Sequence, residues 1–526
     1  MSDPETHATP QTKGAGRARR LVHNSLWGTL AFVLTVAAQL ALTPIYVKYL
    51  GFDGFGLLNI LISILTPLSM LNLGFGQATI KYVAERCAVG RPDQAGAYVR
   101  STLLFNTGLG VLGAVLIWVG AGWLVAIYKT EPRFVADATV GFRLVGAGWL
   151  FTQIGSTFMG VPTALQQFRI VSLWTVVFST LSASTGLLVL EAGGTFTQLM
   201  ITRAMWTALA AVVWWRVAAA LLPGISFWPS YDRDIFRKSM NFGVWQSMAS
   251  LGGVLAAQTD TFLLSRYLGE SAVGVYRIPS LAYQQVYALV AKLAESLFPA
   301  ISDMEGQGQA KEATRLVTRG TWLISLAMVS CMGGLFVFAP DVLRLYMHGT
   351  LPPVAADVLR LFCVSSMITS ATPGLVQYLL GSAQSVWLAG LSLSSGVVTF
   401  AASLIMVRKL GLNGAAWGML AGVMLTRPAI YFAMWRQLFR PAVPFWTLFV
   451  ALFGCPLIGL VICLGLTALR GRTGWTPGWF QVILLGSATT AFIGAATAWI
   501  CTRLPGGADR RRDLTTILGI VARRRR

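Results

Sequence analysis

The stretch from 103 to 127 reads LLFNTGLGVLGAVLIWVGAGWLVAI and contains no charged side chain. A helix of this length is about 37 Å long, which exceeds the roughly 30 Å of hydrocarbon in a bilayer. Lipid offers the backbone no hydrogen-bond partners, so a segment of this kind must be helical. The whole chain has a similar composition, with 55% hydrophobic and 12% charged residues, whereas soluble domains carry about 25% charged residues. The sequence therefore predicts an all-α polytopic membrane protein.

Comparable apolar runs recur along the chain and predict about fourteen membrane-spanning helices. The runs lie at about 21–47, 54–80, 98–127, 139–164, 169–190, 196–222, 239–265, 273–298, 316–338, 357–380, 384–407, 413–435, 446–469 and 479–502. The first run follows 20 polar residues and is too long for the apolar region of a cleavable signal. We therefore expect it to be a true span.

Basic residues predict the orientation. If the spans alternate, 26 Lys and Arg fall on the side of both termini, ten fall on the other side, and five lie within spans. Cytoplasmic loops are enriched in basic residues, so both termini are expected in the cytoplasm of a bacterial inner membrane. The same rule explains the net charge of +21 without nucleic acid. The tail ending in Arg523–Arg526 adds a basic surface suited to anionic membrane lipids.

The chain repeats itself at an offset of about 218 residues. The stretch Tyr49-Leu50-Gly51 to Gly56 matches Tyr267-Leu268-Gly269 to Gly274 at four positions. Gly90 pairs with Gly308 at the same offset, and Thr202-Arg203 resembles Thr426-Arg427. A duplicated six-span unit inserts twice with the same orientation, which gives parallel repeats about an axis along the membrane normal.

The repeat predicts six segments. They are a cytoplasmic basic tail at 1–20, an N-lobe at 21–222, a cytoplasmic linker at 223–238, a C-lobe at 239–440, two appended spans at 441–503 and a polybasic tail at 504–526. Transporters built from such repeats hold their substrate near the midplane, between the halves.

Several of these motifs resemble a known family. They are Tyr49-Leu50-Gly51 to Gly56, Leu73-Gly74-Phe75-Gly76, Asp260-Thr261-Phe262-Leu263-Leu264 with Tyr267-Leu268-Gly269, and Leu297-Phe298-Pro299. In this order they resemble the O-antigen and oligosaccharide flippases of the multidrug/oligosaccharidyl-lipid/polysaccharide exporter superfamily. The resemblance implies two lobes around a central cavity and export of an undecaprenyl-diphosphate-linked oligosaccharide to the periplasmic leaflet. It also implies partners, namely a polysaccharide polymerase and chain-length machinery.

Sister families of the same superfamily are the alternatives. Lipid II flippases have an arginine-rich first span, whereas residues 21–47 contain no arginine. Multidrug exporters typically carry carboxylates inside the N-lobe, whereas here the intramembrane carboxylate Asp260 lies in the C-lobe. The polysaccharide branch therefore fits best.

Charged residues inside spans are the first candidates for the substrate site, because such charges are costly and tend to be functional. Arg427 and Arg203 are suited to bind the oxygens of a diphosphate, or else they tie helices together. Lys292 and Glu295 are three residues apart and form either a local ion pair or part of the site. Asp260 is a candidate for accepting a coupling proton, or it has a structural role.

Four amides are further candidates, since they can hydrogen-bond sugar hydroxyls or neighbouring helices. They are Asn24, Gln39, Gln77 and Gln258.

An enzyme is the remaining alternative. Asp232-Arg233-Asp234 matches the DxD pattern of glycosyltransferases, which would make the chain a membrane glycosyltransferase or polymerase. The pattern is common by chance, and the surrounding basic residues suit the charged start of a helix. The three histidines and six cysteines lack metal-ligand spacing. We therefore expect a transporter without cofactor or metal.

Overall fold

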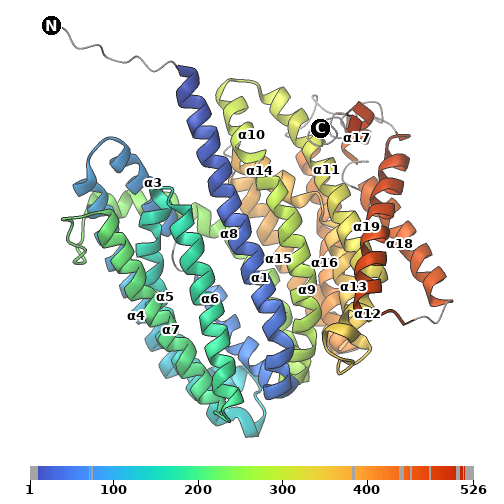
Figure 1. The fold of residues 1–526 in the computed structure, drawn as a ribbon, viewed down its shortest axis with the longest axis horizontal. Coiled ribbons are helices and arrows are strands. Elements are labelled where there is room, and N and C mark those ends of the chain that lie inside the picture. Colours follow the sequence, from blue (N-terminus) through green and yellow to red (C-terminus); the bar gives the residue numbers. More distant parts are fainter. Residues whose placement is uncertain are drawn as a thin grey trace. The chain divides into compact units, whose positions relative to one another are not determined.

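The structure, a computed structural model, describes residues 10–69, 72, 75–295, 297–381, 385–436, 444–449, 453–472, 476–504, 510–512 and 514–515. Every regular element among these residues is a helix (Figure 1). The chain divides into two compact units. Unit 1 comprises Met1–Gly51, Leu68–Ile127 and Glu131–Ser247, and unit 2 comprises Phe52–Pro67, Tyr128–Thr130 and Met248–Arg526.

Unit 1 is a helical bundle centred on α5. Its helices are the first part of α1 (Pro10–Ser63), α3 (Phe75–Ala88), α4 (Pro92–Tyr128), α5 (Val135–Ala164), α6 (Phe168–Glu191), α7 (Phe196–Leu221) and the start of α8 (Arg233–Leu268). Helix α5 packs against α3, α6 and α7. Gly155 of α5 faces the backbone of Ala211 in α7, so these two helices approach closely. The buried core around Phe158 and Trp214 joins α3, α4, α5 and α7.

Unit 2 is centred on α11. Its helices are the rest of α1 and of α8, the start of α2 (Leu65–Ser69), α9 (Glu270–Glu295), α10 (Leu297–Gly306), α11 (Ala310–Val337), α12 (Ala339–Tyr346), α13 (Val354–Ile368), α14 (Thr372–Gly381), α15 (Ser385–Leu410), α16 (Leu412–Met434), α17 (Phe445–Phe449), α18 (Cys455–Gly471) and α19 (Trp479–Cys501). Helix α11 contacts α9, α13, α14, α18 and α19. The final pair α18–α19 is therefore attached to the body of this unit.

A polar contact reinforces this attachment. Asp341 of α12 is buried and forms an ion pair with Arg470 of α18. Arg344, also in α12, donates to the carbonyl oxygen of Pro477 at 2.9 Å, just before α19. The short helix α12 thus holds one end of the α18–α19 pair.

Most predicted spans correspond to one helix, but three do not. The span predicted at 54–80 is not continuous, because α1 ends at Ser63, α2 covers one turn and α3 begins at Phe75. The span predicted at 357–380 is two helices, α13 and α14, bent by 45°. The span at 446–469 comprises α17 and α18, with Pro456 in the first turn of α18. Proline has no N–H and fits the first turn of a helix, and Pro373 likewise starts α14.

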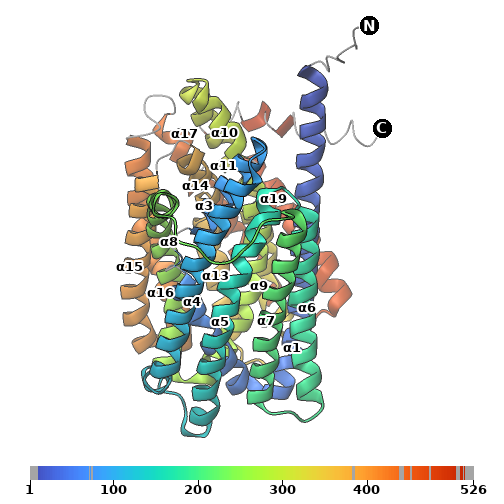
Figure 2. The same cartoon turned by 90° about the vertical axis from the view of Figure 1, so that its left-hand side faces the viewer.

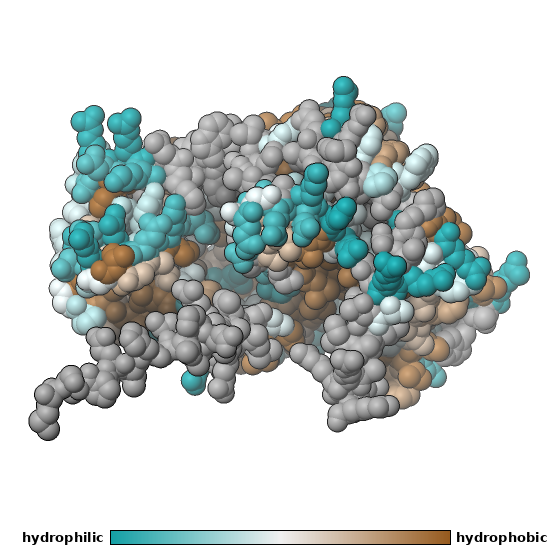
Figure 3. Space-filling view, turned by 90° about the horizontal axis from the view of Figure 1, so that it is seen from above, coloured by the Kyte–Doolittle hydropathy of each residue, from teal (hydrophilic) through white to brown (hydrophobic). Residues whose placement is uncertain are grey.

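The helices have the length and composition of membrane spans. Among the described residues, eight helices are apolar and long enough to cross a bilayer, or nine if α13 and α14 form one span. Large apolar side chains remain exposed on them, such as Val119 and Trp123 of α4. Seen from above, many of the residues nearest the viewer are hydrophilic, and apolar surface is visible below them (Figure 3). The chain is a multi-pass α-helical membrane protein, and the count of fourteen spans stays a prediction.

The backbone repeats at the offset found in the sequence. Glycines with positive φ occur in pairs 218 residues apart, namely Gly51 and Gly269, Gly90 and Gly308, and Gly193 and Gly411. In each pair the two φ values differ by 19° or less. L-residues with a side chain rarely adopt this conformation, so the same turns recur in both copies. The recurrence supports a duplicated unit, while the lobe boundaries at 21–222 and 239–440 stay a prediction.

The two copies of the repeated motif contact each other inside unit 2. A methyl group on Gly56 would overlap the carbonyl oxygen of Glu270, and one on Gly274 would overlap that of Phe52. Each carbonyl belongs to the residue four positions before the opposite glycine, so the crossing of α1 with α9 is reciprocal. Backbones come this close only where both residues lack a Cβ, and Cα–H groups then contact the facing carbonyl oxygens.

Candidate functional site: a polar pocket among membrane helices

Unit 2 contains a pocket of about 290 Å³. It lies among α8, α9, α13, α14, α15 and α16, and all of its lining residues belong to this unit. The charged and polar lining residues are Asp260, Thr261, Tyr276, Arg277, Ser280, Tyr283, Gln284, Tyr287, Ser366, Thr369, Thr372, Ser395, Thr399 and Arg427. Helices α8, α9 and α16 are absent from the apolar spans identified above.

One face of α9 forms the longest wall. Its lining positions are 273, 276, 277, 280, 283, 284 and 287, which recur at intervals of three and four residues. This spacing places all of them on one side of a helix. Tyr276, Tyr283 and Tyr287 add aromatic surface with phenol groups, and Ser280 accepts a hydrogen bond from Gln284 at 3.0 Å. The wall therefore combines stacking surface with hydrogen-bonding groups.

Asp260 of α8 faces this wall. Its Oδ2 accepts a hydrogen bond from the phenol of Tyr276 at 2.5 Å. Its Oδ1 is buried and has no hydrogen-bond partner among the described residues. Asp260 is therefore held by α9 while half of its carboxylate remains available to a proton, a cation or a ligand.

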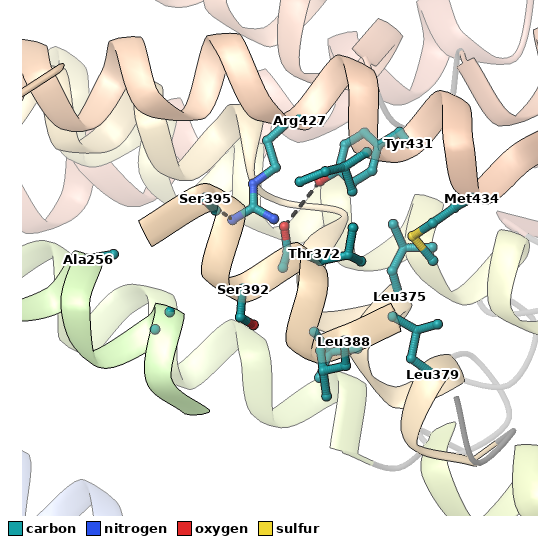
Figure 4. Close-up of a pocket in the computed structure, with 15 residues that line it drawn as sticks. Ala256, Thr372, Leu375, Leu379, Leu388, Ser392, Ser395, Arg427, Tyr431 and Met434 are labelled. Atoms are coloured by element: carbon teal, nitrogen blue, oxygen red, sulfur yellow. Dashed lines mark hydrogen bonds between the residues drawn. The ribbon is translucent and has the colours of Figure 1, made fainter. Parts of the chain in front are cut away.

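Arg427 of α16 is positioned by close packing of α16 against α15. Side chains at Gly414, Gly418 and Gly422 would overlap residues of α15, with Thr399 opposite Gly422. Small residues spaced by four allow membrane helices to approach this closely. One turn further along, the guanidinium of Arg427 lies 3.5 Å from Ser395 Oγ (Figure 4).

A smaller cavity of about 120 Å³ adjoins the pocket and shares Arg427, Thr372 and Ser395 with it. Its far end is apolar, lined by Leu375, Leu379, Leu388, Ile430 and Met434 (Figure 4). The hydroxyls of Thr372 and Tyr431 lie 3.1 Å apart beside Arg427. Arg427 thus stands where a polar chamber meets an apolar one.

The charges in the pocket are not neutralised by ion pairs. Within the described residues, neither Arg277 nor Arg427 forms an ion pair with a carboxylate. The Nε atoms of both are buried without a hydrogen-bond partner. An arginine inside a membrane protein costs about 2.5–3.5 kcal/mol or more, so two such groups facing one cavity favour an anionic ligand. From the sequence, Arg277 counts among the ten basic residues on the side opposite the termini, so its place in the pocket was not predicted.

The other charged candidates lie apart from the pocket. Arg203 of α7 is half-buried in unit 1, beside the phenol of Tyr46 in α1. Lys292 and the exposed Glu295 lie in the last turn of α9, beyond the lining positions. The placement of Arg203 is that expected for a tie between helices, although a substrate role for it stays a prediction.

The amide candidates are also not among the lining residues. Gln39 of α1 and Gln77 of α3 are exposed, and Gln258 of α8 is half-buried. The side chain of Asn24 lies outside the described residues. Among the predicted site residues whose side chains the structure describes, only Asp260 and Arg427 line the same pocket.

The pocket residues that the sequence analysis missed are mainly tyrosines and hydroxyls. Tyr276, Ser280, Tyr283 and Tyr287 share one face of a predicted span. A helical-wheel comparison of polar and apolar faces along 273–298 would have found them, because the stripe has the helical period. Thr399 and Ser395 gave no such signal, since isolated hydroxyls are common in membrane helices.

The DxD pattern has a structural role. Oδ1 of Asp232 accepts hydrogen bonds from the backbone N–H groups of Asp234 and Ile235, at 2.9 and 3.0 Å. It therefore caps the start of α8. No cluster of three or more His, Cys, Asp or Glu suited to a metal is found in the described part of the chain.

The fold is that of known membrane transporters. The lipid II flippase MurJ, solved in an inward closed conformation, is similar with a TM-score of 0.70 over 92% of this chain and 99% of MurJ, at 11% identity. An inward-facing multidrug resistance MATE family transporter of the MOP superfamily is similar with a TM-score of 0.61 over 83% of this chain and 96% of the transporter, at 17% identity. The predicted all-α polytopic fold is confirmed.

Two Bacillus subtilis (strain 168) proteins are similar in sequence. The uncharacterized membrane protein EpsK is 22% identical over 67% of this chain and 73% of its own length. The teichuronic acid biosynthesis protein TuaB is 25% identical over 43% of this chain, and the match covers 42% of TuaB. The family model described as polysaccharide biosynthesis protein matches residues 21–305, more than half of the 526 residues. The predicted family is confirmed, and the chain belongs to the polysaccharide biosynthesis protein family.

Proposed function

We propose that this protein is a flippase that moves an undecaprenyl-diphosphate-linked oligosaccharide from the cytoplasmic to the periplasmic leaflet. The observation that carries the proposal is a cavity inside a membrane unit that exposes two arginines, Arg277 and Arg427, which form no ion pair with any described residue. The oligosaccharide would be a unit of O-antigen, capsule or exopolysaccharide. The related TuaB, whose name assigns it to teichuronic acid biosynthesis, supports a glycan as the cargo.

The chemistry of the pocket suits this kind of molecule. Guanidinium groups bind phosphate oxygens through charge-assisted and often bidentate hydrogen bonds. Tyr283 and Tyr287 offer faces for sugar rings, and Ser280 and Gln284 offer partners for hydroxyls. The adjoining apolar chamber beside Arg427 would take an apolar part of the ligand. A lipid-linked sugar combines these same three chemistries.

Transport by alternating access requires two arrangements of the protein around one site. The recurring glycine turns support two copies of a six-span unit, and such repeats typically rock against each other. Asp260, with one oxygen bound by Tyr276 and the other without a partner, is the proposed acceptor of a coupling cation or proton. Binding and release at this carboxylate would then accompany the movement.

Two other functions share this fold. A lipid II-type flippase or a multidrug exporter is the second candidate, because MurJ and the MATE transporter are both structurally similar to this chain. A membrane glycosyltransferase or polymerase is less well supported, since the carboxylate of Asp232 caps a helix. We propose that the protein is not an enzyme and acts alongside a polysaccharide polymerase and chain-length machinery.

Deleting the gene should reduce a surface polysaccharide and accumulate its lipid-linked precursor on the cytoplasmic side. The reason is that translocation precedes any use of the unit at the outer leaflet. Precursor is measured by mass spectrometry of extracted lipids, and flipping by purified protein in liposomes that contain a defined lipid-linked oligosaccharide. Imposed ion gradients in the same liposomes test Asp260. Normal glycan output with lost efflux of a cationic drug would instead identify a multidrug exporter.

The orientation gives a second prediction. Reporter fusions after Arg100, Lys238 and Arg319 should be active in the cytoplasm, and those near Gly349 and Arg472 in the periplasm. The basis is the excess of basic residues on the side assigned to both termini. A periplasmic reporter at Lys238 would contradict both the inner-membrane orientation and the even number of spans before it.

A further inference from the structure

The segment between α7 and α8 is fixed to unit 1. It runs from the end of α7 across α5 to the start of α8 (Figure 2). Ile225 and Phe227 pack against the core of unit 1, and the ring of Phe227 lies 5.6 Å from that of Phe158. Arg100 of α4 donates a hydrogen bond to the carbonyl oxygen of Ser226 at 3.2 Å. This linker therefore has a defined inner face and a defined outer face.

The outer face has the composition of a membrane interface. Trp228 is 82% exposed and Tyr231 is 65% exposed. Exposed Trp and Tyr are typical of the headgroup region of a bilayer, where their rings are partly solvated. Three exposed basic residues follow directly, Arg233, Arg237 and Lys238. Asp232, which caps α8, and the exposed Asp234 offset two of these charges, so the surface keeps a net charge of +1.

An apolar groove of about 350 Å³ begins at this surface. One wall is a face of α4 formed by Ser101, Leu104, Phe105, Gly108, Leu109 and Leu112, and the other is formed by Tyr231 and Phe236. Phe236 packs on Phe75 and Phe105 with ring centroids 5.4 and 5.9 Å apart, and Phe75 stacks on Phe105 at 4.0 Å. The floor of the groove is thus a rigid aromatic cluster.

We propose that this groove binds an anionic phospholipid of the surrounding membrane. One acyl chain lies along α4 from Ser101 to Leu112, and the phosphate lies against the basic residues that follow Phe236. An acyl chain explains the apolar groove on a membrane-spanning helix, and a negative headgroup explains the cations at its end. A free phosphate would use only the cations, and a zwitterionic lipid would gain little from them. This site lies wholly in unit 1 and does not depend on the proposed flippase activity.

Gly108 provides a sharp test. A Cβ atom added there meets nothing within 4 Å, so Gly108→Leu is expected to place its side chain in the groove. Gly122→Leu is the matched control, because Gly122 is in the same helix, also meets nothing within 4 Å, and does not line the groove. For the cations, Arg237→Gln with Lys238→Gln is compared with Lys311→Gln with Arg315→Gln, exposed residues at the start of α11.

The full-length protein is purified in detergent with phosphatidylglycerol or phosphatidylcholine, and bound lipid is counted by native mass spectrometry. The wild type should retain phosphatidylglycerol in preference to phosphatidylcholine by roughly tenfold or more, given that each basic residue near a membrane contributes about a factor of five. Gly108→Leu should lose the retained lipid, and the Arg237/Lys238 pair should lose only the preference for phosphatidylglycerol. The melting temperature of each variant checks that it is folded.

A photoreactive residue in place of Leu109 adds a direct measurement in membranes. It should form an adduct with the mass of phosphatidylglycerol in the wild type and a weaker one in Gly108→Leu. Equal lipid loss in Gly108→Leu and Gly122→Leu would mean that the lipid is only part of the general shell around the protein. No preference between the two lipids, or a crosslink to a second copy of the chain, would also overturn the proposal.

Discussion

A leucine in place of Gly418 is expected to prevent stable folding of unit 2 and with it all transport. Its side chain would overlap the backbone of Ser403 in α15, so α15 and α16 would have to separate. Overpacking of a close interface costs about 1–3 kcal/mol, and more where the obstacle is backbone. The separation would also move Arg427, which lies two turns further along α16. The expected result is low abundance in membranes and a melting temperature several degrees lower in detergent.

The control for this prediction is Gly390→Leu. Gly390 is in α15, and a Cβ atom added there meets nothing within 4 Å. This variant adds the same apolar volume to a membrane helix and should insert and melt like the wild type. Near-normal stability of Gly418→Leu would mean that the close packing of α15 on α16 does not position the pocket.

The double variant Arg277→Gln with Arg427→Gln should remain folded and lose nearly all flipping of the lipid-linked oligosaccharide. Hydrogen bonds to charged groups contribute about 1.5–3 kcal/mol each, so each single change should weaken substrate binding by roughly 10- to 100-fold. Glutamate at 427 should be worse than glutamine, because it repels an anionic ligand in a poorly screened site. Lysine at 427 should retain part of the activity, or less if a bidentate contact is needed.

Protein stability must be measured beside transport in these variants. Neither arginine has an ion-pair partner among the described residues. Replacing it by glutamine should therefore not deprive a buried carboxylate of its partner. Arg143→Gln is the matched control, since Arg143 lies in α5 near the ring of Trp118 and outside the pocket. Full transport by a well-folded Arg277/Arg427 variant would remove the pocket as the substrate site.

The sequence predicts the helices well where each span is continuous. Helices α4 to α7 begin and end within about six residues of the predicted positions, because uninterrupted hydropathy marks both ends of such a helix. The hydropathy of the runs at 54–80 and 357–380 does not show where the helices break, and only Pro67 and Pro373 indicate that the chain could bend there. Hydropathy measures the preference of a side chain for an apolar environment and carries no information on the direction of the chain. A bend within an apolar run therefore does not change the hydropathy profile.

The site was predicted only in part, and the successes share one cause. Arg427 and Asp260 were found because a charge in the middle of an apolar run is costly. Arg277 was missed because it is close to the end of a run, where a long basic side chain normally reaches the headgroups. The tyrosines of α9 were not predicted as site residues, because aromatic rings occur in membrane helices both where they face lipid and where they line a cavity.

The reciprocal contact between Gly56 and Gly274 has the geometry of a two-fold interface. The glycine of each copy of the motif lies against the backbone of the other copy, at the equivalent position. Contacts of this kind occur in two-fold dimers of identical chains, where the same surface of each chain must be complementary to itself. The crossing is therefore a self-complementary contact of the kind found between two copies of one chain, here formed within a single chain. A side chain at either glycine would therefore displace the backbone of the other copy of the motif, so each copy restricts the sequence of the other.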